Sequence, residues 1–189
     1  MDTPTRSPAA SDDTSRWPGV VVLIHWLTVL IVLSVFALVF SREFIEDKTT
    51  RQWLLHGHWY AGMSAWLLLL VRIPVRLRST PPDHGLNRLQ RVAATAGHGL
   101  LYLGLLLLPA VGYALACARY GHVDFAGIPL PALVERDRDL AETLEIVHGW
   151  AGWAMLSLVG LHALAALMHH HLFKDDVLRA MLPSRRNQA

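Results

Sequence analysis

Four long apolar windows constrain the fold of this chain more than any other feature. They cover residues 19–41, 53–75, 92–117 and 146–173. Each reaches the ~20 residues that a helix needs to cross a bilayer. The 189 residues are 53% hydrophobic and 17% charged, which is too apolar for an ordinary soluble domain. The sequence therefore predicts an all-α protein, a four-helix transmembrane bundle.

The basic residues are divided unevenly between the two sides of such a bundle. Eleven of the 17 Lys and Arg lie in the N-terminal tail, the second loop and the C-terminal tail, and six lie in the other two loops. Short cytoplasmic loops carry an excess of Lys and Arg, so both termini are expected in the cytoplasm. The small net charge of +2 is thus a signal of topology, and we expect no nucleic-acid partner.

The segments outside the windows complete the predicted organisation. Residues 1–18 form a polar N-terminal tail that lacks the basic start and short apolar run of a signal peptide, so we expect the first window to be a helix of the mature protein. Residues 19–173 form the membrane domain, in which Pro109 should kink the third helix. Asp139 to Glu145 should be a short polar lead-in to the fourth helix. Residues 174–189 form a cytoplasmic tail that we expect to contain a short interfacial helix.

The last window carries histidines at positions where a membrane helix rarely tolerates them. At ~100° per residue, His162 returns to within ~40° of His148, and His169 falls on the same stripe. The rise from His148 to His162 is about 21 Å. Ionisable groups within a bilayer are costly and indicate a functional site. Two imidazoles at two depths therefore predict two stacked cofactors.

Two further histidines supply partners for this pair. His58-x-x-x-Gly62 in the second helix repeats the pattern of His148-x-x-x-Gly152 in the fourth, and both helices run inward from the same side. A flat macrocycle bound by the two histidines would lie against the next helical turn, where a glycine leaves room for it. The first helix places His25 at the depth of His162. The predicted pairs are His58 with His148, and His25 with His162.

The residue types at these positions favour haem over other metal centres. Structural zinc needs four protein ligands, and iron–sulfur clusters need several thiolates, whereas Cys117 is the only cysteine. Haem brings four donors of its own and needs only two axial imidazoles. The sequence contains no CxxCH motif, so the predicted cofactors are two non-covalent haem b groups with the iron bound by His25, His58, His148 and His162.

The chain resembles the bacterial di-haem cytochrome b561 family from Ile24 to Pro183. The motifs that carry the resemblance are Ile24-His25-Trp26, His58-x-x-x-Gly62 with Val71-Arg72, Gly97-His98-x-x-x-Tyr102, Leu108-Pro109-x-x-Gly112, Gly160-Leu161-His162 and Ala165 to Asp175. The resemblance implies the same four axial ligands. It further implies a location in the bacterial inner membrane, in contact with lipid, and a stand-alone enzyme that oxidises superoxide at the periplasmic side and reduces ubiquinone.

Several side chains keep more than one interpretation. His56 is an alternative ligand to His58 on another face of the second helix. His98 and His169 lie near the cytoplasmic side, where they could contact a quinone, supply protons, meet a haem propionate or simply mark the polar interface. Arg72 is a candidate partner of a propionate, although snorkelling to the cytoplasm explains its position equally well.

Two other functions remain open at this stage. The chain could be the cytochrome b anchor subunit of a hydrogenase or dehydrogenase complex, passing electrons from a protein donor to quinone. A purely structural membrane protein would bind no haem. Superoxide is an anion, and a basic funnel would speed its entry. The two far-side loops hold six Lys and Arg but eight acids, or nine with Glu145, so their summed charge does not favour such a funnel.

Overall fold

The computed structural model describes residues 16–82 and 85–183 and contains four long helices. Each is long and apolar enough to span a membrane, which confirms the predicted four-helix architecture. The helices are α1 (Gly19–Ser41), α2 (Lys48–Leu77), α3 (Arg88–Tyr120) and α4 (Arg138–Met168).

Side-chain caps set where three of these helices begin. The Asp47 carboxylate accepts the Thr50 amide proton before α2, and Asn87 and Gln90 form a reciprocal capping box before α3. Asp137 caps α4 in the same way as Asp47. Such caps satisfy the free amides of the first turn. As a result α2 and α3 begin before the apolar windows, and the polar lead-in Asp139–Glu145 forms the first turns of α4.

The helix α3 continues through Pro109 as one element. A proline inside a helix removes one backbone hydrogen bond, and packed neighbours make this tolerable in a membrane. The helix ends at Gly121, whose φ of +82° and hydrogen bond to the Cys117 carbonyl terminate the last turn.

The loop after α3 contains a β-hairpin that the sequence analysis did not predict. Strands β1 (Val123–Phe125) and β2 (Ile128–Leu130) pair antiparallel around Ala126 and Gly127, both with positive φ. Positive φ at both central residues matches the strand twist of a two-residue hairpin. The hairpin is anchored on the helices, because the Trp59 indole donates to the Asp124 carbonyl.

The C-terminal segment folds back onto the start of α1. A π-helical turn, η2 (His169–Phe173), ends at Lys174 in the left-handed conformation, and the chain then reverses. The Trp26 indole donates to the Met181 carbonyl at 2.7 Å. Where a short interfacial helix was expected, the described residues form one 3₁₀ turn, η3 (Arg179–Met181), and residues 184–189 of the tail lie outside the described part of the chain.

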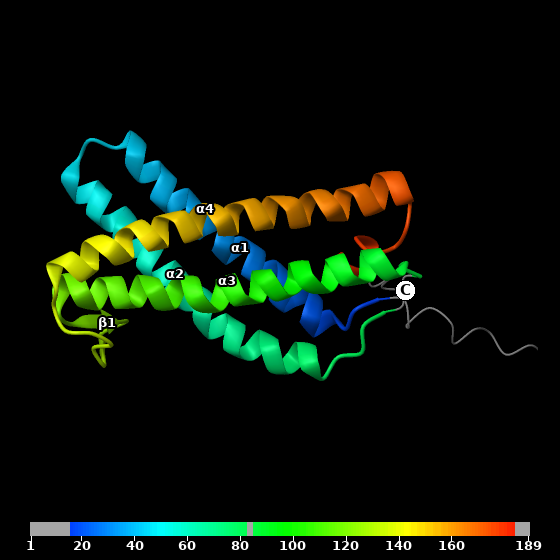
Figure 1. The fold of residues 1–189 in the computed structure, drawn as a ribbon, viewed down its shortest axis with the longest axis horizontal. Helices are drawn as coiled ribbons and strands as arrows, with labels where there is room; N and C mark the ends of the chain where they lie inside the picture. Colours follow the sequence, from blue (N-terminus) through cyan, green and yellow to red (C-terminus); the bar gives the residue numbers. More distant parts are fainter. Residues whose placement is uncertain (1–15, 83–84, 184–189) are drawn as a thin grey trace, which may run out of the picture.

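The helices associate as two antiparallel hairpins. α1 packs along α2, and α3 packs along α4, with further contact between α2 and α3 (Figure 1). The start of α1, the end of α4 and the C-terminal segment lie at one end of the bundle, which we call the inner end. The β-hairpin and the turn η1 (Arg42–Phe44) lie at the opposite, outer end. Most apolar side chains face outward, as expected for helices that meet lipid.

Candidate functional site

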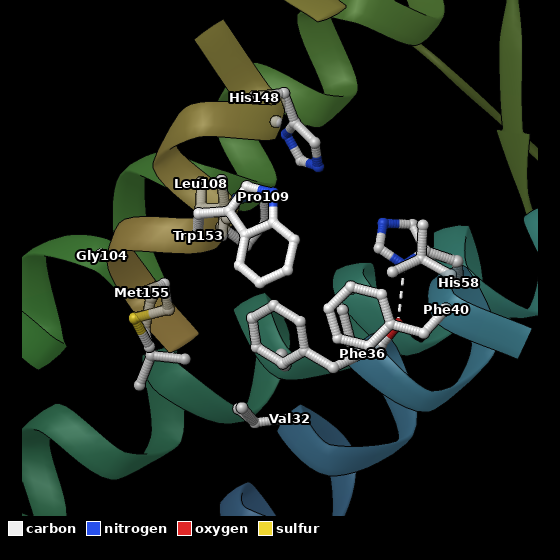
Figure 2. Close-up of a pocket in the computed structure, with 17 residues that line it drawn as sticks. Val32, Phe36, Phe40, His58, Gly104, Leu108, Pro109, His148, Trp153 and Met155 are labelled. Carbon is white, nitrogen blue, oxygen red and sulfur yellow. Dashed lines mark hydrogen bonds between the residues drawn. The ribbon is translucent and has the colours of Figure 1, made fainter. Parts of the chain in front are cut away.

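His58 and His148 face one another across the outer half of the bundle (Figure 2). Their ring centres are 6.1 Å apart, and the ring planes are nearly perpendicular at 82°. The His58 Nδ1 lies 3.0 Å from the carbonyl oxygen of Val35 in α1. A carbonyl only accepts, so Nδ1 carries the proton and Nε2 keeps a free lone pair. This is the second contact that metal-binding histidines usually make.

A cavity of about 210 Å³ opens between these two rings. Its walls are apolar side chains from all four helices, several of which are visible in Figure 2: Val32, Phe36, Phe40, Leu108, Pro109, Trp153 and Met155. Gly62 and Gly152 also line the cavity, and no described neighbouring atom lies within 4 Å of a β-carbon built at either position. The two glycines therefore leave the room that the sequence analysis predicted for a flat group.

The His148 ring is held against the backbone of α3. A β-carbon on Gly112 would lie 2.9 Å from the ring's Cε1 atom, closer than real carbon contacts allow. Only glycine at position 112 therefore permits this approach. The His148 Nδ1 is buried and has no hydrogen-bond partner among the described residues.

His25 and His162 form a second pair in the inner half. Their ring centres are 6.3 Å apart, with an angle of 67° between the planes. The ring of His98 in α3 is 5.4 Å from that of His162. His25 and His162 are half-buried, whereas His98 is exposed as a residue. Three imidazoles thus meet at the inner end, with His162 common to both contacts.

The distance between the ring centres of each pair can be compared with the distance expected for two imidazoles bound to one metal ion. Metal–imidazole bonds are about 2.0–2.1 Å, and a ring centre lies about 1.2 Å from its nitrogen, so two imidazoles on opposite sides of a metal have centres about 6.5 Å apart. The two predicted pairs, at 6.1 and 6.3 Å, come within about 0.4 Å of this distance, whereas the His98–His162 separation of 5.4 Å is about 1 Å shorter. Edge-to-face rings can also sit at this distance. The Nδ1 contact of His58 and the open glycines make the outer pair suited to haem.

Arg72 occupies the space beside the inner pair. Its guanidinium donates to the Tyr102 hydroxyl at 3.1 Å and to the Thr28 hydroxyl at 3.2 Å, and it contacts the His25 Nδ1 at 3.1 Å. A guanidinium has no acceptor atom, so Nδ1 of His25 accepts and its proton sits on Nε2. Iron binding through Nε2 therefore requires that proton to leave and Arg72 to turn away from His25. The distance between His25 and His162 therefore suits haem, whereas the tautomer of His25 that Arg72 favours does not.

The sequence of the whole chain has known relatives. The family model of prokaryotic cytochrome b561 matches residues 16–184. This chain belongs to the prokaryotic cytochrome b561 family. A protein of Yersinia pestis named probable superoxide oxidase CybB is 33% identical over 165 residues, covering 86% of this chain and 93% of the relative. Cytochrome b561 homolog 1 of Escherichia coli K12 is 28% identical, over 91% of this chain and 99% of the relative.

Family membership explains the character of the site. Prokaryotic cytochromes b561 are helical membrane proteins that bind haem b and transfer electrons. The chain is therefore an integral membrane electron-transfer protein of the oxidoreductase class.

His56 and His169 lie apart from the two pairs. His56 is exposed and its ring lies 6.3 Å from that of Trp53, so it does not share the cavity with His58. The His169 Nδ1 lies 2.5 Å from a carboxylate oxygen of Asp175, at the inner end of α4. The other oxygen of Asp175 accepts the Val177 amide proton. His169 is thus fixed by the folded-back C-terminal segment.

The sequence did not predict the roles of three side chains at these sites. Thr28 accepts from Arg72, Asp175 holds His169, and Met155 lies in the cavity wall. Thr28 has a local signal, since it lies three residues after His25. The roles of Asp175 and Met155 depend on chain reversal and on helix packing, which the apolar pattern does not reveal.

Proposed function

We propose that this cytochrome b561 holds two haem b groups and carries electrons across the bacterial inner membrane to ubiquinone, with superoxide as the donor at the periplasmic side. His58 and His148 would bind one iron, and His25 and His162 the other. The observation that carries the proposal is the presence of two imidazole pairs, one in each half of the bundle, with ring centres 6.1 and 6.3 Å apart, close to the distance for two ligands of one metal ion.

The residues of the outer site have distinct tasks. Val35 fixes the tautomer of His58, so that Nε2 is free to bind iron. Gly112 lets His148 sit against α3, and Gly62 and Gly152 leave space for the macrocycle. The apolar wall keeps water away, and such a shell would control solvent access and the redox potential of a bound haem. When bound, each haem supplies a one-electron centre with no open coordination position.

At the inner site Arg72 is the candidate partner for a haem propionate. It lies between Thr28, Tyr102 and His25, with its charge unpaired by any described carboxylate. Its release from His25 would let the ring proton move from Nε2 to Nδ1, which frees Nε2 for iron, and would supply a cation to an acidic group. Charge-assisted contacts of arginine with carboxylates are strong and directional.

Quinone reduction fits the inner end. The two candidate residues are His98, beside His162, and His169, whose Nδ1 is engaged by Asp175. Nε2 of His169 is then the atom left to contact a quinone oxygen or to pass a proton. The uneven distribution of Lys and Arg supports a cytoplasmic inner end with both termini on that side.

Superoxide as donor is supported by the name of the Yersinia pestis relative. The reaction balances when two superoxide anions each give up one electron and become oxygen, and one ubiquinone takes both electrons and two protons and becomes ubiquinol. On the outer side Arg119 pairs with Glu145 at 2.6 Å and Arg138 with Glu142 at 3.2 Å. Each pair cancels one positive and one negative charge, so the outer loops keep their excess of acids and their net charge does not itself attract an anionic donor.

The proposal is tested on the purified full chain reconstituted with ubiquinone. A superoxide source is added while the haem α-band, ubiquinol and oxygen are followed together, with superoxide dismutase as the control. We expect fast haem reduction and ubiquinol formation, both abolished by the dismutase. Haem that dithionite reduces but superoxide does not would contradict superoxide as donor and would point to a protein donor.

A further inference from the structure

A single side chain of α4 lies midway between the two histidine pairs. Met155 follows His148 by seven residues and precedes His162 by seven. Seven residues are about two helical turns, or about 10.5 Å, so the three side chains share one face of α4. His148 and His162 are half-buried, whereas Met155 is only 4% exposed. The bundle is therefore packed at this level and more open on either side.

The thioether of Met155 is seated in a notch of α3. A β-carbon on Gly104 would lie 2.8 Å from the Met155 sulfur. Real β-carbons do not come so close, so the sulfur occupies space that any other residue at position 104 would fill. Ala65 of α2, at 4% exposure, contributes another small residue to the same level, and Leu69, one turn further inward, is fully buried.

Met155, Gly104 and Ala65 all line the cavity between His58 and His148. In Figure 2 Met155 lies next to Gly104, away from the His148 ring. Met155 is also the lining residue of α4 that is nearest in sequence to His162. It therefore closes the outer cavity on the side that faces the inner pair.

We propose that Met155, held in the Gly104 notch, is the partition between the two haem sites and a positioning residue for the outer haem. The inference rests on the proposed two-haem function. A methionine suits this place because its unbranched, polarizable side chain fills an irregular gap. The partition limits how far inward the outer macrocycle can lie and keeps apolar protein between the two redox centres.

The decisive variant is Gly104→Ala. The added methyl group meets the end of a flexible side chain, so the fold is retained and Met155 moves into the outer cavity. We expect outer-haem occupancy to fall by about half or more and the g-values of the remaining outer haem to shift, as overpacking displaces neighbours. The inner haem should keep its electron paramagnetic resonance signal. Gly99→Ala is the matched control, because Gly99 lies in the same helix and has open space around its β-carbon position.

The double variant Gly104→Ala/Met155→Ala separates this role from a general packing defect. If the effect of the alanine passes through Met155, removal of the thioether should restore outer-haem occupancy to that of Met155→Ala alone. Wild-type spectra in Gly104→Ala, or an unrelieved loss in the double variant, would overturn the partition. A wild-type protein with only one haem would instead overturn the two-haem function itself.

Discussion

The imidazole of His148 lies directly against Gly112 of α3, with its Cε1 atom 2.9 Å from the place that a β-carbon on Gly112 would take. The glycine is needed for close approach, since α3 is helical at this point and no unusual φ is involved. A residue on one helix thus decides the orientation of a candidate ligand on another.

Substitution of Gly112 by alanine should therefore weaken the outer haem site without unfolding the chain. The methyl group would push the His148 ring away from α3, and we expect haem affinity to fall about 10- to 100-fold, the range for groups that orient a metal ligand. Haem content per chain after purification, measured by the pyridine haemochrome assay, checks this. Gly99→Ala should retain full haem content. An unchanged outer haem in Gly112→Ala would mean that His148 is oriented by other contacts.

Gly152→Leu should exclude the outer haem by filling its space. No described atom lies within 4 Å of a β-carbon at Gly152, and this residue lines the cavity, so a leucine side chain would extend into the space that a bound group needs. We expect about one haem per chain in place of two, with helical content preserved by circular dichroism. Gly160→Leu, on an exposed position of the same helix, is the control. Two haems in Gly152→Leu would place the outer macrocycle elsewhere.

Arg72→Gln should lower the midpoint potential of the inner haem alone. Removal of a positive charge favours the oxidised iron, and one charge at about 8 Å in an effective dielectric of about 20 is worth about 2 kcal/mol, or on the order of 90 mV. A redox titration of both haems measures the change. Arg78→Gln, at the exposed end of α2, should leave both potentials within error. A shift of both haems together would count against a local role for Arg72.

The sequence was sufficient for the features that depend on local geometry. The helical period places His148 and His162 on one face and explains the repeated His-x-x-x-Gly pattern. In the structure the ring centres of the two predicted pairs are 6.1 and 6.3 Å apart. The contacts of Arg72 with Thr28 and Tyr102 could not be predicted, because they join three helices whose rotation depends on packing. Iron ligation by these pairs stays a prediction.

Helix boundaries and loops could also not be predicted from the apolar pattern alone. Apolar windows mark the part of a helix that meets lipid, whereas polar caps such as Asp47 and Asn87 decide where the helix begins. The β-hairpin around Ala126 and Gly127 is too short to give an alternating pattern. Its position depends on Trp59, which lies over sixty residues away in the chain.

The start of α2 should loosen as the pH falls. Hydrogen bonds from Thr50 lower the pKa of the Asp47 carboxylate below its ordinary value. A carboxyl group with a lowered pKa in the folded state stabilises that state above its unfolded pKa, and this contribution is lost as the pH falls through the folded value. Amide exchange at Thr50, corrected for its intrinsic rate, should accelerate in acid. Asp47→Asn, which keeps a capping acceptor without a titrating group, should abolish this pH dependence.

The central claim is that two separate pairs of histidines each hold one haem. The most direct measurement is the haem stoichiometry of the purified wild-type chain and of His148→Ala and His162→Ala, with electron paramagnetic resonance to resolve the two low-spin signals. We predict two haem b groups in the wild type and one in each variant, with a different signal lost in each. One haem in the wild type, or retention of both in either variant, would contradict the assignment.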